Sequence, residues 1–455
     1  MASRSDKAPS SILIVGSGVF GLGIAYALAQ RPEYKDTKIT VLDRLAFPAG
    51  DGSSIDLSRI VRADYADPAY ALLMKEAAVQ WRGEFGLEGR YSESGLCIVM
   101  DDDNDLGKNY MNKSLENVQA KLGLRRGPRE QGGQVTVLES ESAIHDVVKG
   151  MDGSVGKQGY VNWTSGWAHA EDGVKHMRQL VEATGRVDFQ VAQVSRLLFN
   201  SSYTAISGVQ TADGKHITAD LTILATGAWT PALLDLRGIA SANGQVLSYL
   251  ELTPAEQESL GSNPTILNES NGMFIIPPRD NILKVARHGY GYANPTTIPH
   301  PERDPASNET ITVSLPYTHL QDPNLVIPPE GLQTCRAYLA KTIPWLADRA
   351  FKYTRMCWYT DTPTSDWLIT HHPRYAGLFV ATGGSGHGYK FLPVIGERIV
   401  DVLQGKDRDE LGATLREKWA WPKEKFRDEH VWTDDWRGGR KGMVLSEEMG
   451  KGSKL

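Results

Sequence analysis

A short strand, a glycine-rich turn and a helix follow one another near the start of the chain, and this order constrains the fold more than any other feature. SILIV at 11–15 is an apolar run of strand length, and GSGVFG follows at 16–21. LGIAYALAQR at 22–31 is typical of a helix whose small residues face a sheet. KITVLDR then predicts a second strand that ends at Asp43. Together these segments predict a βαβ unit.

The glycines of this turn fit the pattern G-x-G-x-x-G of dinucleotide-binding proteins. Gly16 permits a tight turn, Gly18 lets the backbone approach a pyrophosphate, and Gly21 lets helix and strand pack closely. Asp43 follows about 20 residues later, where an acid that binds a ribose is expected. The alternative is an ordinary βαβ turn. Candidate cofactor-binding residues of this unit are Gly16, Gly18, Val19, Phe20, Gly21, Asp43 and Arg44.

Two later segments favour FAD over NAD as the dinucleotide, and Asp43 would repel the extra phosphate of NADP. ADLTILATGAW at 219–229 resembles the strand-end element that many FAD-binding proteins place beside their first glycine loop. ATGGSGHGYKF at 381–391 is a second glycine loop that opens a helix. A helix N-terminus there would stabilise the negative charge that a reduced flavin carries at its pyrimidine edge. A plain strand–helix turn is the alternative for this segment.

The length of 455 residues indicates two or three lobes. We expect a mixed α/β (α+β) fold, in which a Rossmann-type FAD-binding domain is interleaved with a substrate domain built on a mixed β-sheet. The predicted FAD-binding domain is discontinuous and comprises 1–85, 155–235 and 355–405. Residues 86–154 and 236–354 are assigned to the substrate domain, and 406–455 to a peripheral C-terminal tail with some packed tryptophans.

The charge and the termini restrict partners and location. A net charge of −6 argues against binding to nucleic acid or to an anionic membrane. The N-terminus lacks the apolar region of a signal peptide, and no apolar run is long enough to cross a bilayer. Ser453, Lys454 and Leu455 form an S-K-L signal, which predicts a peroxisomal location and a peroxisomal import receptor as partner. Chance combined with a basic tail is the alternative.

The three cysteines are Cys97, Cys335 and Cys357, and none is near another in the sequence. This odd number and wide spacing argue against a disulfide scaffold and against a cysteine zinc site. No metal site is expected. We assign Cys97 and Cys335 to packing, whereas Cys357 lies in TRMCWYTDTP at 354–363, between bulky side chains.

Four segments together resemble a known family. GSSIDLSRIVR (52–62), ILKVARH (282–288), CWYTDTP (357–363) and GGSGHGYKF (383–391) occur in the order and context of monomeric sarcosine oxidase and its relatives. Those relatives include pipecolate, saccharopine and fructosyl amino acid oxidases. The resemblance extends from residue 11 to about 404. It implies an FAD-dependent amine oxidase that acts on a small-molecule amino acid and O₂, and these enzymes are often monomers.

The resemblance also implies roles for individual residues. Cys357 matches the cysteine that bonds to the flavin 8α-methyl, and Lys284 matches the lysine that activates oxygen. Arg62 and Lys390 match the pair that binds the substrate carboxylate. The remaining matches are polar residues of the substrate pocket (His288, Tyr359 and His387) and further contacts of the cofactor (Ser53, Ser58, Arg59, Gly384, Gly386, Gly388 and Lys390).

One segment departs from the family patterns and leaves the substrate open. Sarcosine oxidases have a His-Gly pair just before the arginine segment, where this chain reads SSIDLS. Fructosyl amino acid oxidases share the Asp-Leu but continue with Asn-Lys, where this chain has Ser58 and Arg59. The chain therefore falls between subfamilies.

Each assignment has a structural alternative. Arg59 and Arg62 are three residues apart, so in a helix they would form a solvated basic face. In NILKVARHGY, Lys284 and His288 share one face of a strand, which suits a polar pocket but, on the pattern alone, favours solvent. His387 has a structural hydrogen bond as its alternative, and Cys357 has simple packing.

We expect an oxidase of a secondary (N-methyl or N-alkyl) amino acid that produces an imine and H₂O₂. The alternatives are a fructosyl amino acid oxidase (amadoriase), and a biosynthetic oxidase that cyclises an N-methyl amino acid. An NAD-dependent dehydrogenase and a flavin-binding protein without catalysis are the more distant ones. A yellow protein that consumes O₂ with an amine would exclude the last two.

Overall fold

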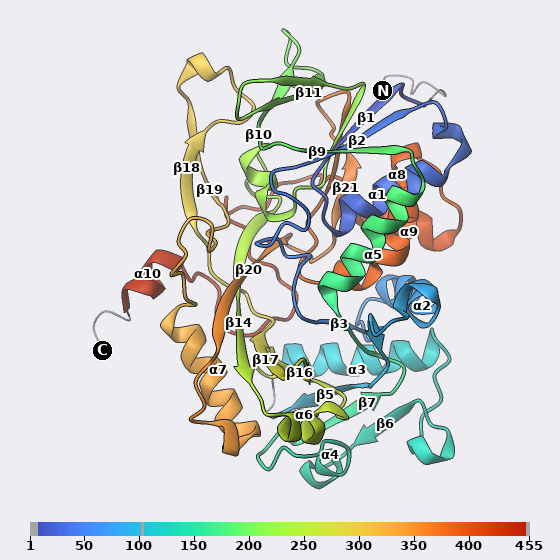
Figure 1. Ribbon diagram of the computed structural model, residues 1–455, viewed down its shortest axis with the longest axis vertical. Helices are drawn as coiled ribbons and strands as arrows, with labels where there is room; N and C mark the ends of the chain where they lie inside the picture. The colour runs from blue at the N-terminus through green and yellow to red at the C-terminus, as the bar shows by residue number, and fades with distance from the viewer. Residues whose placement is uncertain (1–7, 102–103, 452–455) are drawn as a thin grey trace.

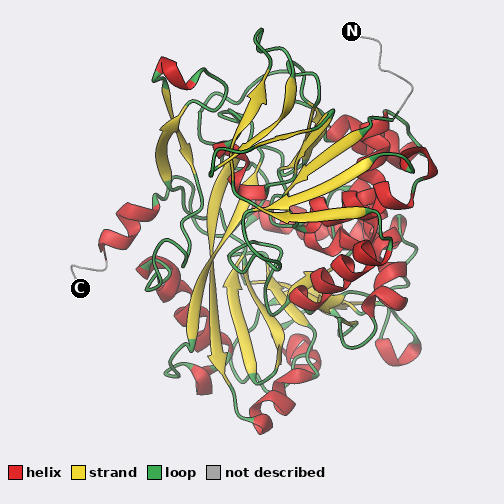
Figure 2. Cartoon of the chain, turned by 45° about the horizontal axis from the view of Figure 1, so that its top comes forward, coloured by secondary structure: helices red, strands yellow, loops and turns green. Residues whose placement is uncertain are grey.

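The computed structural model describes residues 8–101 and 104–451. The predicted S-K-L signal at 453–455 therefore lies outside the described residues. Two large sheets organise the chain, one mainly parallel and one mainly antiparallel (Figures 1 and 2). The fold is thus the mixed α/β class expected from the sequence.

The parallel sheet has six strands in the order β21-β22-β13-β1-β2-β9, and only β21 runs antiparallel to its neighbour. Side chains of β1 alternate between two cores: Ile12 and Ile14 pack with helices α1, α5 and α8, whereas Leu13 and Val15 pack toward the small sheet β10-β11-β12. In Figure 1 these helices lie beside β1 and β2. The bounds are β1 Ser11–Val15, β2 Lys38–Asp43, β9 Val187–Val191, β13 Leu221–Leu224, β21 Leu368–His371, β22 Leu378–Thr382, β10 Val194–Phe199, β11 Ile206–Thr211, β12 His216–Thr218, α1 Val19–Gln30, α5 Ala170–Ala183 and α8 Leu392–Gln404.

The second sheet has eight strands in the order β20-β14-β17-β16-β15-β5-β7-β6. Its longest pairing joins β14 to β20, in a register that sets Gln245 opposite Cys357. Helices α7 and α4 cover one face, and α3 covers the other. The bounds are β5 Leu96–Met100, β6 Val135–Leu138, β7 Gln158–Asn162, β14 Ser241–Glu251, β15 Thr265–Asn268, β16 Met273–Arg279, β17 Ile282–Arg287, β20 Tyr353–Asp361, α3 Asp105–Ala120, α4 Glu141–Val147 and α7 Pro329–Thr342.

Smaller elements complete the chain. The sheet β3-β8-β4 and the hairpin β18-β19 stand apart from the two large sheets. Arg59 begins β3, so the segment that carries Arg59 and Arg62 is extended and not the helix turn considered above. The bounds are β3 Arg59–Val61, β4 Tyr91–Ser92, β8 Gly166–Ala168, β18 Pro295–Pro299, β19 Thr310–Ser314, α2 Pro68–Arg82, α6 Pro254–Gly261, α9 Glu410–Lys418 and α10 Leu445–Gly450.

The chain crosses repeatedly between the two large sheets. Two strands, however, belong to a different large sheet from the one that the predicted domain division implies. β7 and all but the first two residues of β20 fall in segments assigned to FAD binding, and both strands pair within the eight-stranded sheet. Their hydrogen-bond partners come from β5, β6 and β14, which the linear sequence does not reveal. The exact domain boundaries remain a prediction.

The segment after α9 is not peripheral throughout. Gly438 bridges Gly289, and its amide donates to the His288 carbonyl at 2.9 Å. Trp419 and Trp436 are buried, as expected for packed tryptophans. Among the described residues, no helix combines the length and apolar character needed to cross a membrane.

Candidate active site

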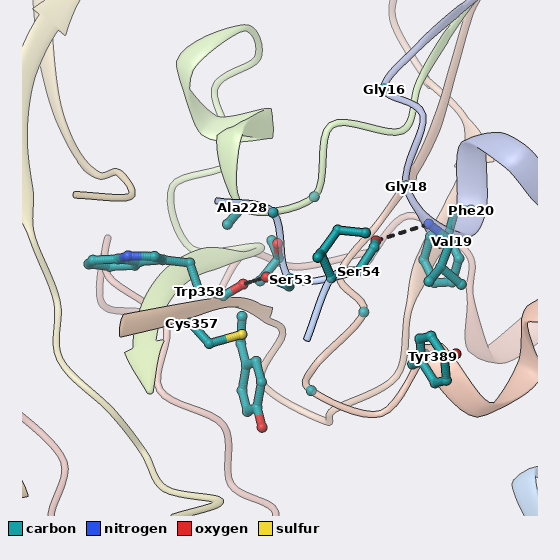
Figure 3. A pocket seen from close by; sticks show the side chains of 18 of the residues that line it. Gly16, Gly18, Val19, Phe20, Ser53, Ser54, Ala228, Cys357, Trp358 and Tyr389 are labelled. Carbon is teal, nitrogen blue, oxygen red and sulfur yellow. Dashed lines mark hydrogen bonds between the residues drawn. The ribbon is translucent and has the colours of Figure 1, made fainter. Parts of the chain in front are cut away.

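A cavity of about 360 Å³ extends from the β1–α1 turn to strand β20, between the two large sheets. Figure 3 shows Gly16, Gly18 and Val19 near one end and Cys357 with Trp358 toward the other. Of the predicted site residues, Gly21 and Ser58 do not line the cavity. Those that do are Gly16, Gly18, Val19, Phe20, Asp43, Arg44, Ser53, Arg59, Arg62, Lys284, His288, Cys357, Tyr359, Gly384, Gly386, His387, Gly388 and Lys390.

The first end of the cavity is built from backbone. A Cβ atom on Gly16 would lie 2.4 Å from the Ala225 carbonyl oxygen, and one on Gly21 would lie 1.9 Å from the Gly16 carbonyl oxygen. Gly21 therefore acts by packing α1 against the turn. Ser17 donates to Asp43 Oδ2 from its amide at 2.7 Å and from its hydroxyl at 2.6 Å. The N-terminus of α1, which begins after Gly18, faces this end with amides that suit phosphate.

Arg44 makes two contacts at this end of the cavity. Its guanidinium lies 4.1 Å from the centre of the Trp229 ring, and it forms an ion pair with buried Asp51. Trp229 also lines the cavity. The glycine cradle, the acid at Asp43 and the second glycine loop, which reaches from Phe20 of α1 to Tyr359 of β20, fit a dinucleotide of the FAD type.

Cys357 lies at the other end, on β20, and is 3% exposed. Burial alone would raise the pKa of its thiol, but Arg59 and Arg355 outweigh this effect and hold the pKa below its usual range. Arg59 Nη2 lies 3.6 Å from the sulfur. In contrast, burial raises the pKa of Cys97 to about 12 and that of Cys335 to about 11. Of the three thiols, Cys357 is the one poised to form a thiolate.

Arg355 also fixes the loop that faces Cys357. Its guanidinium donates to the Ile55 carbonyl and to the Gly52 carbonyl, each at 2.7 Å. Ser53, from the same loop, donates to the Trp358 carbonyl. The loop at 52–55 is therefore attached to β20 on both sides of the thiol.

Lys284 is 1% exposed, so the solvent-facing interpretation of its strand is wrong. Its strand, β17, lies inside the eight-stranded sheet between β14 and β16, and the loop before β3 covers the lysine. Its Nζ donates to the Ser58 carbonyl at 2.9 Å and to Asp56 Oδ2 at 2.5 Å. Ser58 thus contacts the site through its backbone and not through its hydroxyl.

Arg62 and Lys390 lie on either side of Tyr65. Arg62 Nη2 donates to the Tyr110 hydroxyl at 3.0 Å, and its guanidinium lies 4.8 Å from the centre of the Tyr65 ring. Lys390 Nζ donates to the Tyr65 hydroxyl at 2.9 Å. Both side chains are buried, and within the described ranges no carboxylate forms an ion pair with either. Burial, Arg62 and Arg437 lower the pKa of Lys390 well below its usual range, so an anionic ligand is needed to stabilise its charged form beside the buried Arg62.

Both histidines of the site are neutral at physiological pH. Burial lowers the pKa of His288 well below its usual range, and the nearby cations Arg437 and Arg62 lower it further. Burial and then Lys390 do the same to His387. His288 Nδ1 lies 3.4 Å from the Tyr359 hydroxyl, and His387 Nδ1 lies 3.1 Å from the Tyr65 hydroxyl. A neutral imidazole can accept a hydrogen bond from a substrate amine.

Several residues of the site were not found from the sequence. Asp56 binds Lys284, although it stands inside the quoted arginine segment. Tyr65 and Tyr110 hold Arg62, and nothing in the sequence distinguishes them from packing tyrosines. Arg437, in the C-terminal segment, donates to the Ser385 carbonyl of the second glycine loop at 3.0 Å.

A metal centre finds no support in these side chains. Across residues 8–101 and 104–451, no group of three or more His, Cys, Asp or Glu side chains is arranged to hold a metal ion.

Comparison with known proteins gives one consistent result. The profile of a family described as FAD dependent oxidoreductase matches residues 11–402. Amino acid oxidase imqH of Aspergillus flavus is 32% identical, over 91% of this chain and 98% of its own length. L-saccharopine oxidase of Schizosaccharomyces pombe is 28% identical, over 93% and 95%. The solved structure of fructosamine oxidase (Amadoriase II) from Aspergillus fumigatus superposes with a TM-score of 0.79 at 26% identity, over 97% of this chain and 96% of that one.

Proposed function

Because the chain belongs to this family of FAD-dependent oxidoreductases and is an amino acid oxidase of its sarcosine, saccharopine and amadoriase group, we propose that its substrate is a secondary, N-alkyl amino acid. The observation that carries this proposal is the buried pair of basic side chains, Arg62 and Lys390, which have no carboxylate within ion-pair distance in the described chain. Arg62 offers a bidentate fork to a substrate carboxylate, and Lys390 offers a point charge. Relatives named sarcosine oxidase and saccharopine oxidase support the N-alkyl class.

The site residues prepare the substrate for oxidation. FAD, when bound, would supply the acceptor for a hydride from the α-carbon and the route of its two electrons to O₂, which corresponds to formation of an imine and H₂O₂. The carboxylate clamp fixes the α-carbon in one orientation, which removes most of the entropic cost of a productive approach. The neutral imidazole of His288, beside the Tyr359 hydroxyl, can accept a hydrogen bond from the substrate amine.

Lys284 is proposed to assist the reaction with oxygen. Its ammonium lies in the cavity wall, buried and fixed by Asp56 and by the Ser58 carbonyl. A fixed positive charge in a low-dielectric site stabilises the negative charge that develops on O₂ as it takes up electrons.

Cys357 is proposed to hold the FAD covalently through its sulfur: an S–C bond to the 8α-methyl carbon would replace the S–H and one C–H bond, and the two electrons released would reduce the flavin and pass to O₂. The support is its lowered pKa, its place in the wall of the cavity and the resemblance of its motif. The test is acid precipitation followed by peptide mass measurement. A covalent bond leaves the yellow colour in the pellet and adds the mass of FAD to the peptide that contains Cys357. Free FAD in the supernatant and an unmodified Cys357 peptide from active enzyme would contradict the proposal.

The substrate class is tested by a peroxide-release screen of the purified holoenzyme. The panel contains sarcosine, N-methyl aromatic amino acids, pipecolate, saccharopine and fructosyl-lysine, each beside its decarboxylated analogue where one exists. Peroxide from N-alkyl amino acids but not from their decarboxylated analogues supports the proposal. Peroxide from primary amines at equal rates would refute it.

A fructosyl amino acid oxidase is the second candidate. The support is the structural similarity to Amadoriase II and to other fructosyl peptide oxidases, with TM-scores of 0.79 and 0.82 at 26% and 25% identity. Peroxide from fructosyl-lysine, at a kcat/KM above that for every N-methyl substrate, would select this candidate.

A peroxisomal location is also proposed, since relatives from mouse and human are named peroxisomal sarcosine oxidase at 23% identity. A fluorescent protein fused ahead of residue 1, with and without Ser453, Lys454 and Leu455, tests it by microscopy. Punctate fluorescence that coincides with catalase only when the three residues are present is expected. Equal distributions of the two fusions would contradict it.

A further inference from the structure

Asp56 was not among the predicted site residues, but its side chain accepts several hydrogen bonds. It lies in the loop before β3, and its side chain is 2% exposed. Oδ2 accepts from Lys284 Nζ at 2.5 Å, while Oδ1 accepts from the Tyr249 hydroxyl at 2.5 Å and from the Leu57 amide at 2.7 Å. Arg59 Nη1 also donates to Oδ2. A carboxylate with this many donors stays ionised in a buried place.

Lys284 has one carboxylate within ion-pair distance in the described chain, and it is Asp56. Its other charged or titratable neighbours come from three elements: Arg59 on β3, Arg355 and Cys357 on β20, and Tyr249 on β14. Phe274 on β16 presents its ring at 5.6 Å. Burial lowers the pKa of Lys284, and Arg59 and Arg355 lower it further; a Cys357 thiolate would raise it, but the bond to FAD proposed above removes that anion. The ammonium therefore depends on a neighbouring anion for its charge.

The charge of Arg59 depends less on Asp56 than the charge of Lys284 does. Its side chain is 17% exposed, against 1% for Lys284. It also donates to the Ser53 carbonyl at 2.9 Å and to the Ser58 carbonyl at 3.1 Å. Arginine keeps its proton in proteins whatever its partner, but a buried lysine does not. Loss of Asp56 would accordingly change the charge of Lys284 and not that of Arg59.

We propose that Asp56 is a positioning residue, which keeps Lys284 charged and fixed in the cavity wall through a buried ion pair and thereby sustains the reaction with oxygen. The inference rests on the oxygen role proposed above for Lys284. In that reaction O₂ gains two electrons and one proton from the reduced cofactor and a second proton from water, and it leaves as H₂O₂. Lys284 supplies charge and keeps its own proton, so Asp56 is needed throughout the cycle.

The experiment compares the wild-type holoenzyme with Asp56→Asn from pH 6 to pH 10. Each enzyme is reduced chemically without amine and mixed with O₂, and the return of oxidised flavin absorbance gives the reoxidation rate. In parallel, the enzymes are labelled with ¹³C at lysine Cε, and the resonance that Lys284→Met removes is followed by NMR across the same pH range. The second measurement reports the charge of Lys284 independently of turnover.

Asp56→Asn is expected to convert a flat rate profile into one that falls as pH rises. Without an anionic partner, burial favours the neutral form of Lys284, so the charged fraction should be small at pH 8 and should grow as pH falls. Reoxidation at pH 8 should then slow by about a hundredfold and recover toward pH 6. The Cε resonance should titrate over the same range, whereas in wild type its titration should lie at higher pH. Asp56→Glu, which keeps the carboxylate, should recover most of the rate at pH 8.

Two results would overturn the inference. One is an Asp56→Asn enzyme whose Cε resonance keeps its charged position up to pH 10. The other is a reoxidation rate of Asp56→Asn that is slow and equal at pH 6 and pH 8. A loss of structure would produce such a rate, whereas a loss of charge on Lys284 would not.

Two further controls separate the causes of failure. If Lys284→Met reoxidises at the wild-type rate, the oxygen role is wrong, while the Cε titration still decides whether Asp56 holds the proton. If Asp56→Asn does not fold, the double variant Asp56→Asn/Lys284→Met is examined. Recovered folding supports the ion pair, because both charges are removed together. Continued failure, with Lys284→Met folded, would show that Asp56 serves Arg59 and Tyr249 instead.

Discussion

The two ends of the long cavity recognise their ligands in different ways. The end beside the six-stranded sheet is shaped by backbone, since Gly16 and Gly21 leave no room for a Cβ atom. The end beside the eight-stranded sheet is shaped by charge, with Arg62, Lys284 and Lys390 buried in it. A backbone cradle needs neighbours in sequence, whereas a charged pocket needs side chains brought together by strand register. Substitutions at the first end should abolish cofactor binding, and those at the second should change individual steps.

The largest effect is expected for Gly21→Ala at the backbone end. The added Cβ would lie 1.9 Å from the Gly16 carbonyl oxygen, so α1 must move away from the turn. We expect protein without FAD and a loss of about 1–3 kcal/mol in the free energy of unfolding. Flavin absorbance per protein and urea denaturation measure the two effects. Gly50→Ala is the control, since no atom lies within 4 Å of its added Cβ. A yellow Gly21→Ala enzyme of normal stability would contradict the backbone interpretation.

Lys284→Met should leave FAD bound and slow one half of the cycle. Without the fixed ammonium, reoxidation of reduced enzyme should slow by about 10²–10³-fold, while anaerobic reduction by substrate slows far less. Stopped-flow absorbance separates the two rates. Lys352→Met removes a lysine that is 45% exposed and should change neither. If reduction collapses and reoxidation survives, Lys284 belongs to the substrate site.

Arg62→Ala should act on recognition of the carboxylate. Loss of one partner of a charge-assisted contact costs about 2–4 kcal/mol, so kcat/KM for an amino acid should fall by about 30- to 1,000-fold. For the decarboxylated amine the change should be small. Arg82→Ala, at a surface ion pair with Glu93, is the matched control. An equal loss on both substrates would reject the clamp.

The smallest effect is expected for Arg437→Gln, which removes a buried cation near both histidines. The pKa values of His288 and His387 are lowered first by burial and also by Arg437, so they should rise in the variant. If neutral histidine is the active form, the acidic limb of the kcat/KM profile moves up by about half a unit to one unit of pH. Arg437→Lys keeps the charge and should restore the profile, and exposed Arg440→Gln should not move it. If the acidic limb of the kcat/KM profile does not move in Arg437→Gln, the charge of Arg437 does not affect the pKa values of the two histidines.

The sequence predicted the backbone end in detail because its determinants are local. The strand, turn and helix at 11–30 and the acid at Asp43 appear as expected in β1, α1 and β2. At the charged end, the resemblance placed Cys357 and Lys284 in the cavity wall, but the strand pattern alone misjudged Lys284 as exposed. Burial of a strand face depends on what covers it, and the covering loop at 52–58 is far away in the sequence.

Other parts of the charged end had no local signal. The Tyr249 hydroxyl donates to Asp56. This contact is possible only after β14 has paired with β17. Arg437 reaches the second glycine loop from beyond residue 402, where the family profile ends. An isolated arginine in a polar segment is normally solvated. Its burial follows from the bridge between Gly438 and Gly289, which no periodicity in the sequence predicts.

The bridge at Gly438 also determines when the site can exist during biosynthesis. Its amide donates to the carbonyl of His288, which lines the cavity, so a wall residue is held by a segment that lies beyond the last lining residue, Lys390. The ribosome adds residues in order, at about 5–20 per second, and the earlier sheets can form while synthesis continues. The pocket closes only after residue 438 has emerged. A nascent chain that stalls before residue 438 therefore has a nucleotide cradle but lacks a contact that holds the wall of the substrate pocket.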